Sequence, residues 1–347
     1  MSQVTRAPGT KKTVPTEMKA RSRVPLSRIA NPKSSAVPPA RKSTSTRCPQ
    51  QKVSMTPTNS DSVSPNTSIL HTNDATFKFT PLTIGQPNDP SDVIQYENII
   101  YRTMRIKEQT MKPLTFHQTE ITLKDRNCLI DAICRYHYKL SLTTNTLYRF
   151  IGIFDRFLSS EDIPKKMLKV YGCAAFLIAS KIEDIYPAQS TDLVKLSEKA
   201  FTQRELFAAE IFVINAIGFD TTFPTPLFFL THFMRIEDHH KESLLLARYI
   251  LEAMQTAEQF YGMKASLMAS IAIYATRMIN GATESWPSSI LHYTMYNKSD
   301  MIQPSDYVRA ILLEENREET RFMRKKYGSE LFLFVARVSI PTTYNMI

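Results

Sequence analysis

Two pairs of adjacent side chains in this sequence have types that could do chemistry. Glu183 and Asp184 could form an acid/base pair, and His239 and His240 could bind a metal ion. Neighbouring residues on a helix point in different directions, so a solvated helix end explains the two carboxylates better. The histidines stand in the polar stretch IEDHHKES, where surface exposure explains them better than a metal site. Neither pair predicts catalysis.

The other nucleophilic and metal-binding residues also lack a pattern that supports an enzyme. The chain has four cysteines with no C-x-x-C spacing, namely Cys48, Cys128, Cys134 and Cys173. This arrangement predicts neither a zinc site nor a disulfide framework, and free thiols suit a reducing compartment. There is no P-loop, and no G-x-G-x-x-G, H-E-x-x-H or G-x-S-x-G motif. We therefore predict no catalytic residue, no metal and no cofactor.

The stretch RVPLSRIAN at residues 23–31 could instead be read by another protein. Arg23, Leu26, Ile29 and Asn31 have the spacing R-x-x-L-x-x-I-x-N, and the prolines beside them disfavour a helix. The shorter R-x-x-L pattern recurs at three places, Arg126–Leu129, Arg248–Leu251 and Arg309–Leu312. These copies fall within predicted helices, so we expect their leucines to be packed. None of them continues with Ile and Asn at the next two positions.

Most of the net charge lies around that motif. The formal net charge is +10, and residues 1–90 account for +9 of it, with 13 Lys/Arg, 4 Asp/Glu and 12 of the 20 prolines. Such a segment cannot bury enough apolar surface to offset its ordering entropy, so we predict a disordered basic tail. Residues 91–347 have a net charge of only +1, which does not favour nucleic-acid binding. Without a signal peptide or an apolar stretch of membrane-span length, we expect a soluble intracellular protein with no membrane partner.

Beyond the tail, the sequence changes to helical periodicity. Val93, Tyr96, Ile100 and Met104 recur at the spacing of an amphipathic helix, which must pack on something. Few glycines interrupt the following residues, and no strand alternation is evident. The predicted helices span residues 92–108, 123–139, 145–159, 165–183, 190–196, 203–217, 226–235, 240–259, 264–280, 287–296 and 305–326.

Local signals mark where several of these helices begin. The stretches Thr122–Asp125 and Thr202–Glu205 have the residue types of capping boxes. Proline at or near the first helical position is expected at Pro226 and at Pro304.

Two of the predicted helices are apolar on every face and must be surrounded by other helices. They are LKVYGCAAFLIASKI at 168–182 and KASLMASIAIYATRMI at 264–279. AAFLIASK (174–181) aligns without gaps over SIAIYATR (270–277), which indicates an internal duplication. The sequence thus predicts an all-α protein with two helical bundles, each built around a buried central helix.

Several segments in the right order resemble a known family, the mitotic cyclins. RNCLIDAICRYHYKLSLTTNTLYRFIGIFDRFLSS (126–160) resembles the first two helices of the cyclin box, and CAAFLIASKIEDIYPAQSTDLV (173–194) resembles its third helix and following loop. GFDTTFPTPLFFL (218–230) is similar to the linker between the two boxes. WPSSILHYTMYN (286–297) and KKYGSELF (325–332) resemble late segments of these proteins. The nearest type is a B-type (or A/B-like) mitotic cyclin.

The resemblance implies an all-α fold of two tandem five-helix cyclin boxes. It divides the chain into a disordered regulatory tail at 1–90, an N-terminal helix and linker at 91–120, a first, kinase-binding box at 121–222, and a second box with a C-terminal extension at 223–347. It also implies a non-catalytic subunit that binds and activates a cyclin-dependent serine/threonine kinase at the G2/M transition, in nucleus and cytoplasm.

Other cyclin-fold functions remain as alternatives. A DNA-binding initiation-factor-like protein would have a zinc ribbon and basic boxes, and this chain has neither. A cyclin for a transcriptional kinase would not be expected to turn over through a tail signal. A scaffold that has lost kinase binding would not need to keep the family's kinase-binding residues.

Six residues match the family's kinase-binding positions. Lys181 and Glu210 correspond to a Lys and a Glu that hydrogen-bond the kinase segment leading into its helix C. The apolar positions around this pair are Ile178, Ile182 and Ile214, and Tyr186 is a weaker candidate in the loop after the third helix. From the residues alone, Lys181 is better explained as a cation at a helix C-terminus and Glu210 as a surface charge, and the family match is what favours kinase binding.

Two further sets of residues follow from the resemblance. Arg126 and Asp155 match a structural ion pair between the first two box helices. The groove in which many cyclins dock R-x-L peptides usually has Met, Leu and Trp on the first helix, and this chain has DRNCLIDAI. The altered groove positions are Asp125, Leu129, Ala132 and Lys169, so we predict weak or altered R-x-L docking.

The motif at 23–31 now resembles the destruction box through which the anaphase-promoting complex recognises mitotic cyclins. Several lysines lie near it on chain predicted to be flexible, where a ubiquitin ligase could modify them: Lys11, Lys12, Lys19, Lys33 and Lys42. The resemblance thus implies a second partner, this ubiquitin ligase, and regulated destruction.

Overall fold

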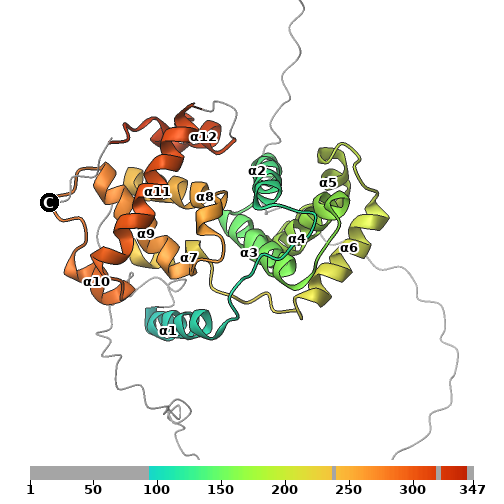
Figure 1. Cartoon of the computed structure of the whole chain (residues 1–347), viewed down its shortest axis with the longest axis horizontal. Coiled ribbons are helices and arrows are strands. Elements are labelled where there is room, and N and C mark those ends of the chain that lie inside the picture. The colour runs from blue at the N-terminus through green and yellow to red at the C-terminus, as the bar shows by residue number, and fades with distance from the viewer. Residues whose placement is uncertain (1–93, 237–239, 318–321, 342–347) are drawn as a thin grey trace, which may run out of the picture. The chain divides into compact units, whose positions relative to one another are not determined.

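The computed structural model describes residues 94–236, 240–317 and 322–341 (Figure 1). All of these residues belong to one compact unit that spans Asn73–Ile347. Every regular element in these ranges is a helix, in agreement with the all-α prediction. The predicted basic tail, with Arg23, Leu26, Ile29 and Asn31, lies outside the described residues.

Five helices form the first helical box. They are α2 (Leu123–Lys139), α3 (Thr144–Ser160), α4 (Leu168–Glu183), α5 (Ser190–Leu196) and α6 (Gln203–Ala216). A short 3-10 turn, η1 (Lys165–Met167), precedes α4. Helix α4 lies between α3 and α6 and also packs against α2 (Figure 1).

The second helical box repeats this arrangement with five more helices. They are α7 (Pro226–Phe233), α8 (Lys241–Gln255), α9 (Ala265–Ile279), α10 (Ser288–Thr294) and α11 (Lys298–Arg317). The turn η2 (Glu258–Phe260) joins α8 to α9. Helix α9 packs against α7, α8 and α11. The segments that align in sequence, 174–181 and 270–277, therefore occupy the central helices of the two boxes.

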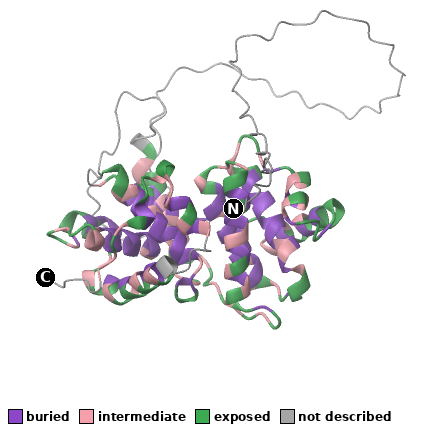
Figure 2. Ribbon diagram, turned by 90° about the horizontal axis from the view of Figure 1, so that it is seen from above, coloured by how far each residue is buried: buried purple, intermediate pink, exposed green. Residues whose placement is uncertain are grey.

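Both central helices are buried along most of their length, as the sequence predicts (Figure 2). Small residues let the neighbouring helices approach them closely. At Gly172 of α4, a Cβ atom would lie 2.4 Å from Cδ2 of Leu129 on α2. A larger residue at Gly172 would push α2 away, and the core of the box would lose contacts there.

The two predicted capping boxes are confirmed. The Thr122 hydroxyl accepts the Asp125 N–H, and the Asp125 carboxylate accepts the Thr122 N–H, so α2 begins where the sequence indicates. Thr202 and Glu205 do the same at the start of α6. At α7, Pro226 occupies the first turn and the Thr225 hydroxyl accepts the Phe228 N–H.

The predicted helix over 305–326 is wrong in two respects. Helix α11 begins at Lys298, where the Asp300 carboxylate accepts the Asn297 N–H (2.8 Å), and Pro304 lies inside it. A separate helix, α12 (Phe322–Tyr327), starts where the Phe322 N–H donates to Asp131 on α2 (3.2 Å). A local bond thus marks the start of α11 and a long-range bond the start of α12, and two further turns follow, η3 (Glu330–Phe332) and η4 (Val335–Arg337).

The helix predicted at 92–108 is present as α1 (Ile94–Thr110), and it packs on the second box. The Tyr101 hydroxyl donates to the Tyr293 carbonyl (2.7 Å), and its ring stacks on His232 at 4.3 Å between centroids. Glu108 accepts the N–H and the hydroxyl of Ser266 at the start of α9 (2.7 and 2.6 Å). The chain therefore crosses from α1 on the second box to α2 in the first.

Helix α12 also connects the two boxes. Its Lys326 ammonium donates to both carboxylate oxygens of Glu252 on α8 (2.8 Å each), and the Tyr327 hydroxyl donates to the same carboxylate (2.7 Å). All three side chains are buried. On the other side, the Phe322 ring meets Tyr138 of α2 at 5.5 Å between centroids.

Candidate functional site

The structure brings Lys181 and Glu210 together on one surface of the first box. Lys181 is in the last turn of α4 and Glu210 is on α6, and the Lys181 ammonium donates to Oε1 of Glu210. The Lys181 side chain is 48% exposed, so solvent or a partner can reach the pair. An ammonium has three N–H donors, and a carboxylate can accept several hydrogen bonds, so both groups can bond a further backbone segment.

The apolar residues predicted around this pair differ in their exposure. Ile178 is buried in the core, while Ile214 is partly buried and packs against it. Ile182 is 45% exposed and Tyr186 is 87% exposed. Ile182 and Tyr186 are therefore available to a partner, whereas Ile178 supports the surface from below.

Four exposed apolar residues at this surface were not predicted. On α6, Phe207 and Ile211 stand one helical turn apart, on the face that also has Glu210 and Ile214. Ile185, in the loop after α4, is 91% exposed, and Phe219, after α6, is 66% exposed with a left-handed φ of 59°. The 3–4-residue spacing on α6 could have indicated the first two, but no periodicity marks residues in loops. Exposed apolar residues gathered around a polar pair are typical of a protein-binding surface.

The loop that presents Ile185 and Tyr186 is fixed by polar contacts at the end of α4. Asp184 accepts the Thr143 N–H (2.9 Å) and the Thr146 hydroxyl, and the Ser180 hydroxyl accepts the Ala188 N–H (3.2 Å). Glu183 forms an ion pair with Arg149 (2.6 Å). The expectation that Glu183 and Asp184 simply form a solvated helix end is therefore wrong, because both carboxylates hold neighbouring elements in place.

Arg126 and Asp155 form a buried ion pair between α2 and α3. Arg126 donates through Nε to Oδ1 (2.8 Å) and through Nη2 to Oδ2 (2.6 Å), which is the bidentate geometry of strong pairs. Its Nη1 also donates to the carbonyl of Gln255, the last residue of α8 (2.6 Å). The pair thus joins the first box to the second, a link that the sequence did not indicate.

The residues at the docking-groove positions on α2 and α4 mostly form bonds within the chain or are buried. The Asp125 carboxylate accepts from the Lys165 ammonium (2.8 Å) and from Thr122, and these bonds lower the pKa of Asp125 to about 2. Leu129 is buried and Ala132 half-buried. Lys169 donates to the Ser197 carbonyl (2.9 Å). The Asp125–Lys165 ion pair therefore stands where the family's groove has the thioether of a Met. The methyl group of Ala132 stands where it has the indole of a Trp.

The remaining candidate residues are the adjacent histidines and the leucines of the R-x-x-L copies. His240 is exposed at the start of α8, and His239 lies outside the described residues. In the described ranges, no three His, Cys, Asp or Glu side chains are grouped as metal ligands. None of the helices in those ranges has both the length and the hydrophobicity that a membrane crossing requires. The leucines of the three R-x-x-L copies in the boxes are buried, as predicted.

Comparisons with known proteins agree with this architecture. The model of the family described as "Cyclin, N-terminal domain" matches residues 97–222, and that described as "Cyclin, C-terminal domain" matches residues 224–341. The solved structure of a viral cyclin from herpesvirus saimiri is similar, with a TM-score of 0.55 and 21% identity, covering 62% of this chain and 97% of that one. At this identity the likeness shows the fold alone.

Curated relatives are mitotic cyclins from distant organisms. The G2/mitotic-specific cyclin-B1 of Oryzias latipes is 28% identical over 347 residues, which is 95% of this chain and 84% of the relative. That of Oryzias luzonensis is 30% identical over 69% of this chain and 60% of the relative. The G2/mitotic-specific cyclin-3 of Saccharomyces cerevisiae is 28% identical over 73% of this chain and 60% of the relative. The chain therefore belongs to the cyclin family, and these relatives are mitotic cyclins, the two fish proteins being of the B type.

Proposed function

We propose that this chain is the regulatory subunit of a cyclin-dependent serine/threonine kinase, which it binds and activates at the G2/M transition. The observation that supports this most is the exposed apolar surface of α4 and α6 with the Lys181–Glu210 pair among its residues. The names of its relatives support a mitotic role. On this proposal the chain itself catalyses nothing, and the kinase supplies the active site.

Activation by such a subunit is a shift of the kinase between two states. A protein kinase is active when its helix C is placed so that a Lys–Glu pair forms. Moving such an equilibrium from 1:99 to 99:1 takes about 5.5 kcal/mol of differential binding. A surface that is already folded can supply this without an ordering cost, because α4 and α6 are fixed by the core of the box. Lys181 and Glu210 would then bond the kinase segment leading into helix C.

The first prediction tests this surface. Pull-down of a cell-cycle kinase, followed by a histone-kinase assay, should show loss of both binding and activity in the Lys181→Ala/Glu210→Ala protein. The matched control is Asp192→Ala/Lys195→Ala, which removes another exposed ion pair of the same box, on α5 (3.4 Å). The control should bind and activate like the wild type. A double variant at Lys181 and Glu210 that still binds and activates the kinase would show that this surface is not the kinase site.

Regulated destruction is the second part of the proposal. The tail motif at Arg23, Leu26, Ile29 and Asn31 would be recognised by the anaphase-promoting complex, and the tail lysines would be ubiquitinated. Support comes from the full R-x-x-L-x-x-I-x-N spacing, which the copies in the boxes lack. We further propose that the protein acts in nucleus and cytoplasm, where mitotic kinases meet their substrates.

A further inference from the structure

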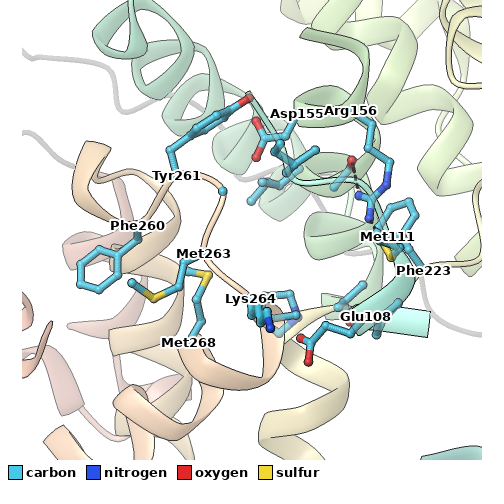
Figure 3. A pocket seen from close by; sticks show the side chains of 18 of the residues that line it. Glu108, Met111, Asp155, Arg156, Phe223, Phe260, Tyr261, Met263, Lys264 and Met268 are labelled. Carbon is cyan, nitrogen blue, oxygen red and sulfur yellow. Dashed lines mark hydrogen bonds between the residues drawn. The ribbon is translucent and has the colours of Figure 1, made fainter. Parts of the chain in front are cut away.

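A cavity of about 390 Å³ lies where the two boxes meet, away from the proposed kinase surface. Helix α3 and the segment after α1 form one side of it, and the segment from η2 to the start of α9 forms the other (Figure 3). Its volume is within the range of small-molecule sites, which are about 300–1,000 Å³. Nothing in the kinase-binding proposal uses this space.

Arg156, on α3, faces this cavity without a carboxylate partner. Its guanidinium donates to the Gly152 carbonyl (2.8 Å) and to the sulfur of Met111 (3.6 Å), and it lies 3.5 Å from the centroid of the Phe223 ring. Among the described residues, no acidic side chain forms an ion pair with it. A guanidinium has five N–H donors, so most of its donors have no strong acceptor. Burial lowers the pKa of Arg156 to about 10, although the charges of Asp220 and Asp155 act in the opposite direction.

The two carboxylates named among the cavity residues are already paired, and the exposed Lys112 and Lys264 also line the cavity. Asp155 is paired with Arg126, and Glu108 accepts from Arg105 and Ser266. The hydroxyl of Tyr261, in contrast, is a buried polar atom with no partner in the described part of the chain. The cavity therefore offers the Arg156 guanidinium, the ammonium groups of Lys112 and Lys264, and the Tyr261 hydroxyl (Figure 3).

The remaining wall is apolar and adaptable. Methionines line much of it, and their flexible thioethers fit ligands of irregular shape: Met111, Met254, Met263 and Met268. Phe223 and Phe260 add aromatic surface. Such a wall suits a short aryl or alkyl body.

We propose that this cavity binds a small organic carboxylate, with its carboxylate on Arg156 and its apolar body among the methionines. A guanidinium and a carboxylate match in planar, bidentate geometry. The apolar wall of methionines favours such a ligand over inorganic phosphate, which has no apolar body to bury. The ligand would contact both boxes and the segment after α1, and would hold them together.

The test compares two probes that differ only in charge, 4-phenylbutyrate and its neutral amide. Calorimetric titration of the full chain should show binding of the carboxylate that is about ten-fold or more tighter than that of the amide. At ten times its Kd, the carboxylate should raise the Tm by roughly 3 °C. Inorganic phosphate, which lacks the apolar body, should bind more weakly than the carboxylate.

Two variants attribute the binding to this cavity. Arg156→Met should abolish the preference for the carboxylate, and because it also removes the bond to the Gly152 carbonyl, the Tm of the unliganded variant is measured first. Met263→Trp should fill the cavity and weaken both probes, and it decides the question if the first variant does not fold. Arg135→Gln, at an exposed ion pair on α2, is the control and should bind like the wild type. Equal affinity for the two probes, or a preference that survives Arg156→Met, would overturn the proposal.

Discussion

At the scale of single residues, the buried polar groups lie mainly at the contacts between elements. Arg126 is almost fully buried, yet it is paired with Asp155, bonded to the Gln255 carbonyl, and 5.4 Å from the centroid of the Tyr261 ring. Each of these contacts reaches a different element. A buried charge is tolerated only when such partners compensate it, so the position of each element depends on the others.

The second prediction concerns this pair. Asp155→Asn leaves the Arg126 charge buried without its counter-ion, and we expect a loss of about 3–5 kcal/mol in the free energy of unfolding, measured by urea titration. The control is Asp192→Asn at the exposed pair with Lys195, which should change stability by less than about 0.5 kcal/mol. A loss below about 1 kcal/mol at Asp155 would contradict the prediction.

His232 of α7 is a buried base with an unsatisfied ring nitrogen. Burial, followed by the charge of Arg235, lowers the pKa of His232 to about 4, and its Nε2 has no partner in the described part of the chain. Glu97 lies 3.4 Å from Nδ1 and would favour protonation, but it also lies 3.3 Å from Arg235. We therefore expect the neutral imidazole, stacked on Tyr101, in the folded protein.

The third prediction follows from this lowered pKa. The unfolded chain binds a proton at His232 near pH 6.5, and the folded chain only near pH 4. The stabilisation is therefore fully present above pH 6.5 and is lost as the pH falls toward 4, by roughly 3 kcal/mol. His232→Phe keeps an aromatic ring beside Tyr101 and should reduce this loss, as measured by unfolding titrations at each pH. Parallel pH profiles for the variant and the wild type would contradict the prediction.

At the scale of elements, local sequence signals predict helices well and their partners poorly. The capping boxes at Thr122 and Thr202 depend on contacts within one turn, so the starts of α2 and α6 were predicted correctly. The start of α11 was predicted wrongly at Pro304, because a bond between Asn297 and Asp300 lets the helix begin earlier. That α1 packs on the second box could not be predicted, since its apolar stripe does not specify its partner.

The candidate site, like the helices and their partners, was predicted from the sequence only in part. Its polar pair on α4 and α6 followed from the family resemblance, and the structure places the two side chains in contact. Ile185 and Phe219 were missed because they lie in loops, where exposure depends on tertiary packing and not on periodicity. The packing of α4 against α6 brings the polar pair and these loop residues onto one surface.

The fourth prediction concerns the groove on α2. A fluorescent R-x-L peptide should bind the wild type weakly in a polarisation assay, because the Asp125–Lys165 pair and Ala132 stand where the family has apolar side chains. Asp125→Met/Ala132→Trp should tighten binding by about ten-fold or more, since each substitution adds apolar surface for the peptide to bury. Binding of the wild type with the affinity usual for cyclins would contradict the prediction.

At the scale of the whole molecule, several connections among the described residues hold the two boxes together. They are the Arg126 contact with Gln255, the α12 side chains on Glu252, and the crossing from α1 to α2. The first two join residues far apart in the sequence, so neither box is completed by its own residues alone.

The fifth prediction concerns the tail. Arg23→Ala/Leu26→Ala should prolong the half-life of the protein through mitotic exit, measured by chase in synchronised cells, and should leave kinase binding unchanged. The control is Val37→Ala/Arg41→Ala, which changes one apolar and one basic tail residue outside residues 23–31 and should be degraded normally. If the Arg23/Leu26 variant disappears as fast as the wild type, the motif does not control turnover.

The packing of α1 has a mechanical consequence. A degradation machine that pulls on the N-terminal tail transmits its force first to α1, the first described helix after the tail. The Tyr101–Tyr293 bond spans 192 residues, so this force acts on the second box before it acts on the first, although the first is nearer in the sequence. Removing α1 uncovers the rings of Phe229, His232 and Phe233. Unravelling from the tail would thus start at the box that lies farther along the chain, while the proposed kinase surface is still folded.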